Sequence, residues 1–300
     1  KEAAKRFAKS MELLPLMNGL AKLATNSILN APPAGNGPFP VLLFSHGYGS
    51  FYGQNTQQME HLASHGYVVV SVGHPYECFW PAGGKNQAGI DEMKAAMKET
   101  GGKSDTPEAM RYLVSHCPIM IRSAEIWADD MSFAADWLEN SEWGGLLNLR
   151  RFGVFGHSFG GAASGEISLR DKRCACFVNL DGALFCNLAK QCTDVPFILL
   201  TSENQVSAGL CPDQRGFLHV VIPDARHFDF SDLPLAIPSF KKSGLLGTID
   251  PVLLQRIVND WLLAFFDFHL RGIPMPEDLS ERWHGAGFVK NAPTQRKENH

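Results

Sequence analysis

The residues with the clearest chemical meaning are Gly156-His-Ser-Phe-Gly160, which fit the pattern G-x-S-x-G. An apolar run, Arg151–Phe155, precedes them, and a Gly/Ala-rich segment typical of a helix start follows. A strand–serine–helix turn of this kind is tight, exposes the hydroxyl, and needs glycines where side chains would clash. The pattern therefore predicts Ser158 as a nucleophile at the start of a helix.

A serine nucleophile needs a general base, and histidine is the most frequent one. The histidines that follow the first acid candidate are His219, His227, His269, His284 and His300. His219 lies inside an apolar run and His269 inside the last helical segment, which favours structural roles for both. His227 comes directly after the last apolar run, where a loop can reach the serine. The sequence therefore predicts His227 as the base.

The acid that orients the base has two candidates. Asp181 follows the apolar run Cys174–Leu180, and Glu203 follows the run Phe197–Leu200. Parallel strands end at the same edge of a sheet, so either carboxylate could reach the base. From these residues alone, Asp181 and Glu203 both stay open.

Catalysis at a carbonyl also needs donors for the oxyanion. The loop Ser45-His-Gly-Tyr-Gly49 directly follows an apolar run, and its glycines let the backbone approach a bound carbonyl. We expect the backbone N–H groups of Tyr48 and Phe159 to be these donors. His74, Phe79 and Trp80 are candidate substrate-binding residues, with a structural hydrogen bond as the alternative for His74 and core packing as the alternative for the two aromatic residues.

Composition excludes several classes of protein. The chain has 300 residues, of which 45% are hydrophobic and 19% charged, as expected for a globular protein. The net charge of −4 gives no reason to expect nucleic acid as a partner, and no apolar run reaches the roughly 20 residues needed to span a bilayer. Cys174 and Cys176 lack the spacing of a zinc site. The compartment stays open, with secretion favoured.

The elements expected to position these residues are short apolar runs alternating with helix-length segments. The expected strands are Pro40–Phe44, Tyr67–Val72, Arg151–Phe155, Cys174–Leu180, Phe197–Leu200 and Phe217–Ile222, and the expected helices include Ile119–Asn140, a segment after Ser158, and Pro251–Leu270. Continuously apolar strands are typical of a sheet covered on both faces. The sequence therefore predicts an α/β fold with a mainly parallel central sheet and helices on both faces.

Three parts are expected along the chain. Residues 1–37 form a basic N-terminal arm, which either packs on the core or touches a lipid surface. Residues 38–292 form a single catalytic domain, and residues 293–300 a tail. Residues 81–117 are longer than a connection between strands requires, which predicts a surface or lid excursion.

Several segments together resemble the plasma/type II platelet-activating factor acetylhydrolase family of the α/β-hydrolase superfamily. They are Val41–Gly49, Leu62–Val69, Gly156–Gly161, Asn179–Gly182, Thr201–Glu203 and the loop around His227. The resemblance runs from about Asn30 to His227 and more loosely to Gly272. It implies an α/β-hydrolase fold and selects Asp181 as the acid, with Glu203 as the alternative. Ala183 departs from the large aromatic residue that family members can carry there. It is therefore a further candidate substrate-binding residue, and a preference for very short acyl groups is in doubt.

These observations predict a serine carboxylic ester hydrolase that works through an acyl-enzyme, with no metal or organic cofactor. The expected substrates are small-molecule or lipid esters with short to medium acyl groups, including phospholipids of the platelet-activating factor type. The alternative is a polyester or lipid hydrolase of cutinase-like activity. A more distant alternative is a non-catalytic α/β-hydrolase that only binds its ligand.

Overall fold

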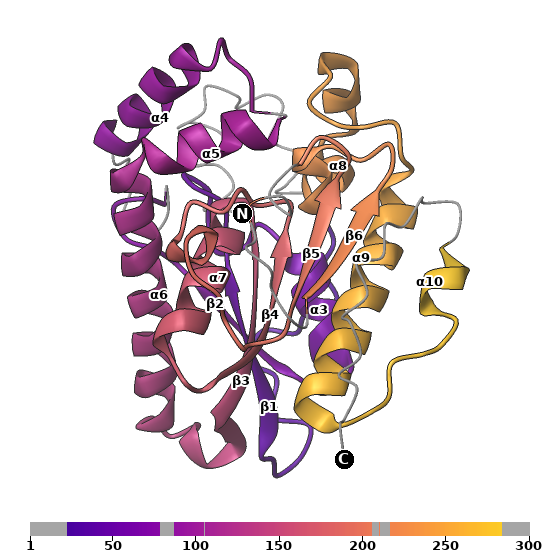
Figure 1. The fold of residues 1–300 in the computed structure, drawn as a ribbon. Helices are drawn as coiled ribbons and strands as arrows, with labels where there is room; N and C mark the ends of the chain where they lie inside the picture. The colour runs from indigo at the N-terminus through magenta and orange to yellow at the C-terminus, as the bar shows by residue number, and fades with distance from the viewer. Residues whose placement is uncertain (1–22, 79–86, 105, 206–209, 211–216, 284–300) are drawn as a thin grey trace, which may run out of the picture.

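The computed structural model describes residues 23–78, 87–104, 106–205, 210 and 217–283 (Figure 1). Residues 1–22 of the expected arm, the candidate residues Phe79 and Trp80, and the expected tail lie outside these ranges. The division of the chain at residues 37 and 292 stays a prediction.

Six parallel strands form one sheet in the order β2-β1-β3-β4-β5-β6. The strands are β1 (Phe39–Ser45), β2 (Val68–Val72), β3 (Leu147–His157), β4 (Cys174–Leu180), β5 (Phe197–Ser202) and β6 (Phe217–Ile222). All six expected strands are present, and β3 begins four residues earlier than the apolar run that predicted it. The α/β-hydrolase fold predicted from the sequence is confirmed.

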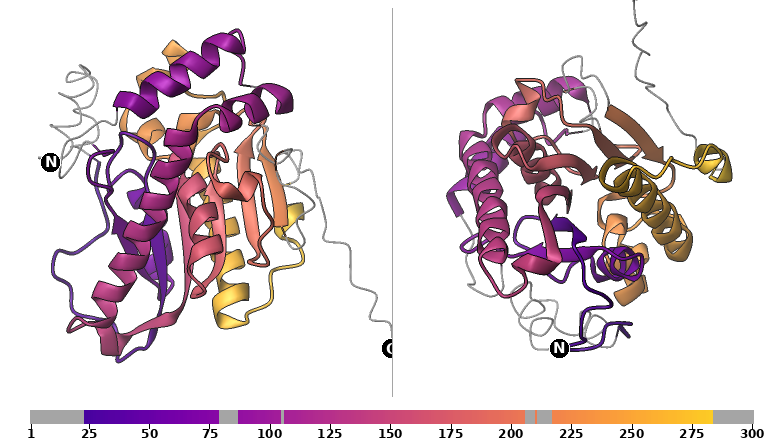
Figure 2. Two further views of the ribbon diagram at one scale, coloured as in Figure 1. Left: turned by 60° about the vertical axis from the view of Figure 1, so that its left-hand side comes forward. Right: turned by 90° about the horizontal axis from the view of Figure 1, so that it is seen from below.

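Helices cover both faces of the sheet (Figures 1 and 2). They are α3 (Thr56–Ser64), α4 (Gln87–Glu99), α5 (Pro107–Ser115), α6 (Pro118–Glu139), α7 (Phe159–Arg170), α8 (Leu233–Ala236), α9 (Pro251–Phe266) and α10 (Leu279–Arg282). One core cluster joins the sheet to α6 and α7, and a second joins its other face to α3 and α9. No helix in the described ranges is both long and apolar enough to cross a membrane.

Alternate residues of each strand supply the two core clusters. In β1, Val41 and Leu43 pack with α6 and α7, whereas Leu42 and Phe44 pack with α3 and α9. All four side chains are completely buried. Side chains of a strand point alternately to its two faces, so a sheet covered on both faces requires an unbroken apolar run.

The excursion between β2 and α6 forms α4 and α5, which lie at the end of the sheet towards which β4, β5 and β6 point (Figure 1). Thr106 caps α5 by accepting the N–H of Ala109 at 3.2 Å, and Pro107 occupies its first turn. Strand register brings His157 beside Leu180 and Leu180 beside Leu200. The loops after these strands therefore meet beneath α4 and α5.

Candidate active site

Ser158 lies on a strained turn between β3 and α7. Its φ is 58° and its ψ is −122°, a conformation that residues with a side chain rarely adopt. The Ser158 N–H donates to the carbonyl of Leu180 at 3.0 Å, and the N–H of Gly161 donates to the Ser158 carbonyl at 3.0 Å. A Cβ at Gly160 would lie 2.0 Å from the Ser45 carbonyl oxygen, so only glycine lets the turn pack this closely.

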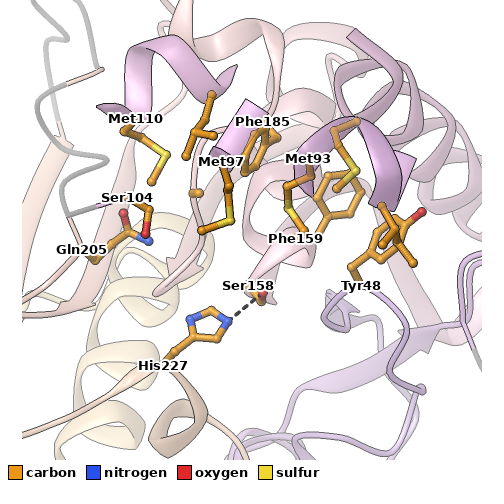
Figure 3. Close-up of a pocket in the computed structure, with 14 residues that line it drawn as sticks. Tyr48, Met93, Met97, Ser104, Met110, Ser158, Phe159, Phe185, Gln205 and His227 are labelled. Atoms are coloured by element: carbon orange, nitrogen blue, oxygen red, sulfur yellow. Dashed lines mark hydrogen bonds between the residues drawn. The ribbon is translucent and has the colours of Figure 1, made fainter. Parts of the chain in front are cut away.

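Ser158, His227 and Asp181 form a hydrogen-bonded chain. The Nε2 of His227 lies 2.9 Å from the Ser158 Oγ (Figure 3), and its Nδ1 lies 2.8 Å from the Asp181 Oδ2. A carboxylate accepts, so Nδ1 carries the proton and Nε2 is left to accept the serine hydroxyl proton. The Asp181 side chain is 3% exposed and that of His227 39% exposed. The arrangement can deprotonate a serine that faces an open space.

Neighbouring groups hold Asp181 in one orientation. Its Oδ1 accepts the Ser202 N–H at 2.6 Å and the Ser202 hydroxyl at 2.8 Å, so Oδ2 faces His227. The N–H of Gly182 donates to the Asn179 side chain at 2.7 Å, which fixes the turn after β4. Glu203, the alternative acid, is exposed in the turn after β5. Asp181, and not Glu203, contacts the histidine.

The two residues predicted as oxyanion donors lie close to Ser158. A Cβ built on Gly47 would lie 3.3 Å from the Ser158 Cβ, so the backbone leading to Tyr48 passes close to the nucleophile. Phe159 is the first residue of α7, where backbone N–H groups have no partner within the helix. The Tyr48 and Phe159 rings pack edge to face with centroids 5.3 Å apart. Their role as donors stays a prediction.

His157 and Gln54 link the loop before Tyr48 to the loop that carries the histidine. The Gly47 N–H donates to the Gln54 Oε1 at 2.9 Å, and the Gln54 Nε2 lies 2.5 Å from the His157 Nδ1. The His157 Nε2 lies 2.9 Å from the His227 carbonyl oxygen. Since a carbonyl only accepts, His157 carries its proton on Nε2. Sequence patterns did not identify Gln54, because its partner is 103 residues away.

Burial, and to a lesser extent the interaction with the neighbouring His227, lowers the pKa of His157 to about 3. The folded state therefore keeps this imidazole neutral, whereas the unfolded chain takes up a proton below pH 6.5. The stability that depends on His157 is fully present above pH 6.5 and is lost as the pH falls from 6.5 towards 3.

His157→Gln should make the protein less sensitive to acid. The difference in unfolding free energy between wild type and variant should shrink by about 2 kcal/mol between pH 8 and pH 5, since each unit of pKa difference corresponds to about 1.4 kcal/mol. Urea unfolding at both pH values measures it. His116→Gln, on an exposed histidine after α5, is the control. A difference that stays constant with pH would contradict the buried, neutral state of His157.

Ser158 and His227 open into a cavity of about 280 Å³ under α4 and α5 (Figure 3). Its lining is mostly apolar and comprises Tyr48, Ile90, Met93, Met97, Ser104, Met110, Leu113, Met120, Ser158, Phe159, Ala183, Phe185, Gln205 and His227. The candidate Ala183 is part of it. Thioether side chains adapt to ligands of different shape, which suits them to an apolar binding site.

His74, a candidate for substrate binding, makes hydrogen bonds of the kind that its structural alternative expects, and a role in binding stays a prediction. His74 is completely buried and does not line the cavity. Its Nε2 lies 2.9 Å from the Ser45 Oγ and its Nδ1 lies 2.9 Å from the Asp130 Oδ2. Within the described ranges, no three His, Cys, Asp or Glu side chains gather in a metal-binding arrangement.

Two family models match separate parts of the chain. The model for platelet-activating factor acetylhydrolase, isoform II, matches residues 131–278, which include Ser158, Asp181 and His227. The model for chlorophyllase matches residues 10–97, which include the loop of Tyr48. The predicted resemblance to the acetylhydrolases is confirmed, although the first part of the chain matches the second model.

Comparisons that cover most of the chain agree with the first family model. The chain is 24% identical to the platelet-activating factor acetylhydrolases of Cavia porcellus and Canis lupus familiaris, over 86% and 80% of its length. It spans 63% and 59% of the length of these relatives. A ferulic acid esterase from Streptomyces cinnamoneus superposes with a TM-score of 0.65 at 26% identity, covering 86% of this chain and 74% of the esterase.

These relatives are acetylhydrolases and an esterase, which are carboxylic ester hydrolases. The six-stranded parallel sheet and the turn at Ser158 agree with that class. The chain thus has the α/β-hydrolase fold and is similar to the platelet-activating factor acetylhydrolases over most of its length.

Proposed function

We propose that the protein is a serine carboxylic ester hydrolase that uses Ser158 as nucleophile, His227 as general base and Asp181 as the supporting acid. The observation that carries the proposal is the hydrogen-bonded chain from Asp181 through His227 to Ser158, which ends at an apolar cavity. A nucleophile with an oriented base beside a substrate-sized space is the arrangement that acyl transfer requires.

In the first half of the proposed reaction, the Ser158 Oγ attacks the ester carbonyl while His227 Nε2 takes the hydroxyl proton. The negative charge forms on the carbonyl oxygen, where the N–H groups of Tyr48 and Phe159 donate to it. The tetrahedral intermediate then breaks the bond to the alcohol oxygen, and His227 returns the proton to that oxygen. The alcohol leaves, and Ser158 carries the acyl group as an ester.

In the second half, water takes the place of the alcohol. His227 removes a proton from the water as its oxygen attacks the acyl carbon, and the same two N–H groups stabilise the second oxyanion. Collapse of this intermediate breaks the bond to the Ser158 Oγ, which regains its proton from His227. The products are the acid and the free enzyme. Asp181 stays ionised throughout and stabilises the imidazolium form of His227.

The cavity favours short to medium acyl groups over polymers. Its volume of about 280 Å³ is close to the lower end of the range for small-molecule sites, about 300–1,000 Å³. Met93, Met97 and Met110 come from α4 and α5, which cover it. The acyl chain of a platelet-activating factor-type phospholipid is small enough for such a space. The polyester hydrolase of the sequence analysis would need an open cleft.

A series of p-nitrophenyl esters from acetate to octanoate, measured beside a short-acyl phospholipid, tests the proposed function. We expect kcat/KM to be highest between acetate and octanoate, with cleavage of the phospholipid at its short acyl ester. Turnover of none of these esters by the purified protein would remove the proposal and favour the non-catalytic alternative.

Ala183→Trp should shift the preference towards acetate. Ala183 lines the cavity two residues after Asp181, and its small side chain leaves room for a longer acyl chain. Each buried methylene contributes roughly 0.8 kcal/mol, so blocking two or three should lower kcat/KM for octanoate by about 10- to 100-fold. Acetate, which does not reach as far, should lose little.

Ala63→Trp, on an exposed position of α3, is the matched control and should leave kcat/KM unchanged for acetate, butyrate and octanoate esters. The measurement is kcat/KM for acetate, butyrate and octanoate esters of wild type and both variants. An equal fall for the three esters in Ala183→Trp would mean that Ala183 does not limit the acyl chain.

A further inference from the structure

Beside the cavity lies a buried polar cluster that the proposed reaction does not use. Its centre is the Glu77 carboxylate, which is in a residue 6% exposed. The Trp127 Nε1–H donates to the Glu77 Oε2 at 2.6 Å, and the Ser123 hydroxyl donates to its Oε1 at 2.6 Å. Burying a carboxylate is costly unless strong hydrogen bonds compensate. These two hydrogen bonds from α6 therefore compensate for the burial of the Glu77 carboxylate.

The Trp127 ring is in contact with both residues proposed as oxyanion donors. Trp127 is 1% exposed and lies parallel to the Tyr48 ring, with centroids 6.2 Å apart. It meets the Phe159 ring edge to face at 4.8 Å. On another side His74 stacks on it at 3.9 Å. The position of Trp127 thus determines where the Tyr48 and Phe159 side chains lie, on the side of Ser158 away from His227 (Figure 3).

Glu77 also holds the backbone of the oxyanion loop. The Gly49 N–H donates to the Glu77 carbonyl at 2.8 Å, and the Tyr48 hydroxyl lies 3.5 Å from the Glu77 Oε1. Burial, and then the Glu77 charge, raises the pKa of Tyr48, so this hydroxyl stays protonated. Tyr48 and Gly49 are therefore both tied to Glu77, the residue whose carboxylate anchors Trp127.

We propose that Trp127, anchored by Glu77, is a positioning residue that sets the geometry of the oxyanion hole formed by Tyr48 and Phe159. The proposal rests on the proposed function, because it assumes that these two N–H groups stabilise an oxyanion. Donors must lie within about 0.5 Å of their working positions to contribute fully, and losing one such donor lowers kcat about 10²- to 10³-fold. Trp127 touches neither the substrate cavity nor the reacting atoms.

The test compares each ester with the matching thionoester, in which sulfur replaces the carbonyl oxygen. Sulfur accepts hydrogen bonds weakly, so an oxyanion hole stabilises its transition state much less. Trp127→Phe keeps an aromatic ring but removes the N–H that donates to Glu77. We expect kcat on the ester to fall about 10- to 100-fold, with KM changed less than about two-fold. On the thionoester the fall should be several-fold smaller.

Two further variants separate positioning from damage to the fold. Trp137→Phe makes the same change on the same helix, at a residue 61% exposed, and should leave both substrates unaffected. Glu77→Leu, which leaves no acceptor for the Trp127 N–H, should give the same loss of ester-to-thionoester selectivity as Trp127→Phe. The double variant should lose little more than either single one, since both remove the same hydrogen bond.

Three results would overturn the proposal. They are an equal loss on ester and thionoester in both variants, a change confined to KM, and losses that add fully in the double variant. Absence of turnover in wild type on both substrates is a different outcome, because it removes the proposed function and this proposal with it. Thermal unfolding of each variant shows whether the fold is retained.

Discussion

Ser158→Ala is expected to lower kcat about 10³-fold or more and to leave the fold intact. The fold should survive because alanine keeps the Cβ, so the backbone at φ 58° is no more strained than before. The backbone hydrogen bonds of the turn, from Ser158 to Leu180 and from Gly161 to Ser158, do not involve the lost hydroxyl. Only the bond to His227 disappears.

Two measurements check this expectation. Turnover of p-nitrophenyl butyrate gives kcat, and intact mass after treatment with a fluorophosphonate shows whether one covalent adduct forms. Wild type should gain one adduct and Ser158→Ala none. Ser168→Ala removes another hydroxyl from α7, one that donates to the Gly165 carbonyl within the helix, and should keep both activity and labelling. Activity near the wild-type level in purified Ser158→Ala would end the assignment of the nucleophile.

The sheet could be predicted from the sequence because each strand is an unbroken apolar run between breaks. The run Cys174–Leu180 predicts β4 to the residue. The turn at Ser158 could be predicted for a related reason, since its glycines are required by local geometry. A strand or a turn can be predicted from the sequence where a local pattern of residues is what the fold requires at that place.

Residues that act through distant partners could not be predicted in this way. Trp127 bonds to Glu77 across 50 residues of sequence, and Gln54 bonds to His157 across 103. Neither pair has a characteristic spacing. His74 follows β2 as His227 follows β6, but the structure buries it completely against Trp127. Position at a strand end therefore does not distinguish a histidine that lines the cavity from one that is buried in the protein.

The excursion of residues 81–117 could be predicted in part from the sequence. Its unusual length predicted a surface or lid element, and the structure forms α4 and α5 from it above the strand ends. That Met93, Met97 and Met110 face the cavity could not be deduced, because the direction of a helix face depends on how α4 and α5 dock on α6. Local periodicity defines a face but not the surface against which it packs.

The choice of acid gives the last prediction, that Asp181→Asn should be far more damaging than Glu203→Gln. The Asp181 Oδ1 accepts two donors from Ser202, so the single oxygen of asparagine is drawn to that side. Its amide NH₂ then faces His227 Nδ1 and can only donate to it. His227 would carry its proton on Nε2, the atom that must accept the proton of Ser158. For a triad acid, such a change of tautomer lowers kcat by about 10⁴.

Glu203→Gln is the matched control, because it makes the same carboxylate-to-amide change on an exposed side chain after β5. It should leave kcat within about two-fold, as surface changes away from a site usually do. The measurement is kcat for one ester with all three proteins, together with thermal unfolding to show that each is folded.

The sequence leaves the two carboxylates equivalent because both follow parallel strands. In the structure they differ because Asp181 is buried and bonds to His227, whereas Glu203 is exposed in the turn after β5. The larger loss in Glu203→Gln would contradict this geometry and make Glu203 the acid.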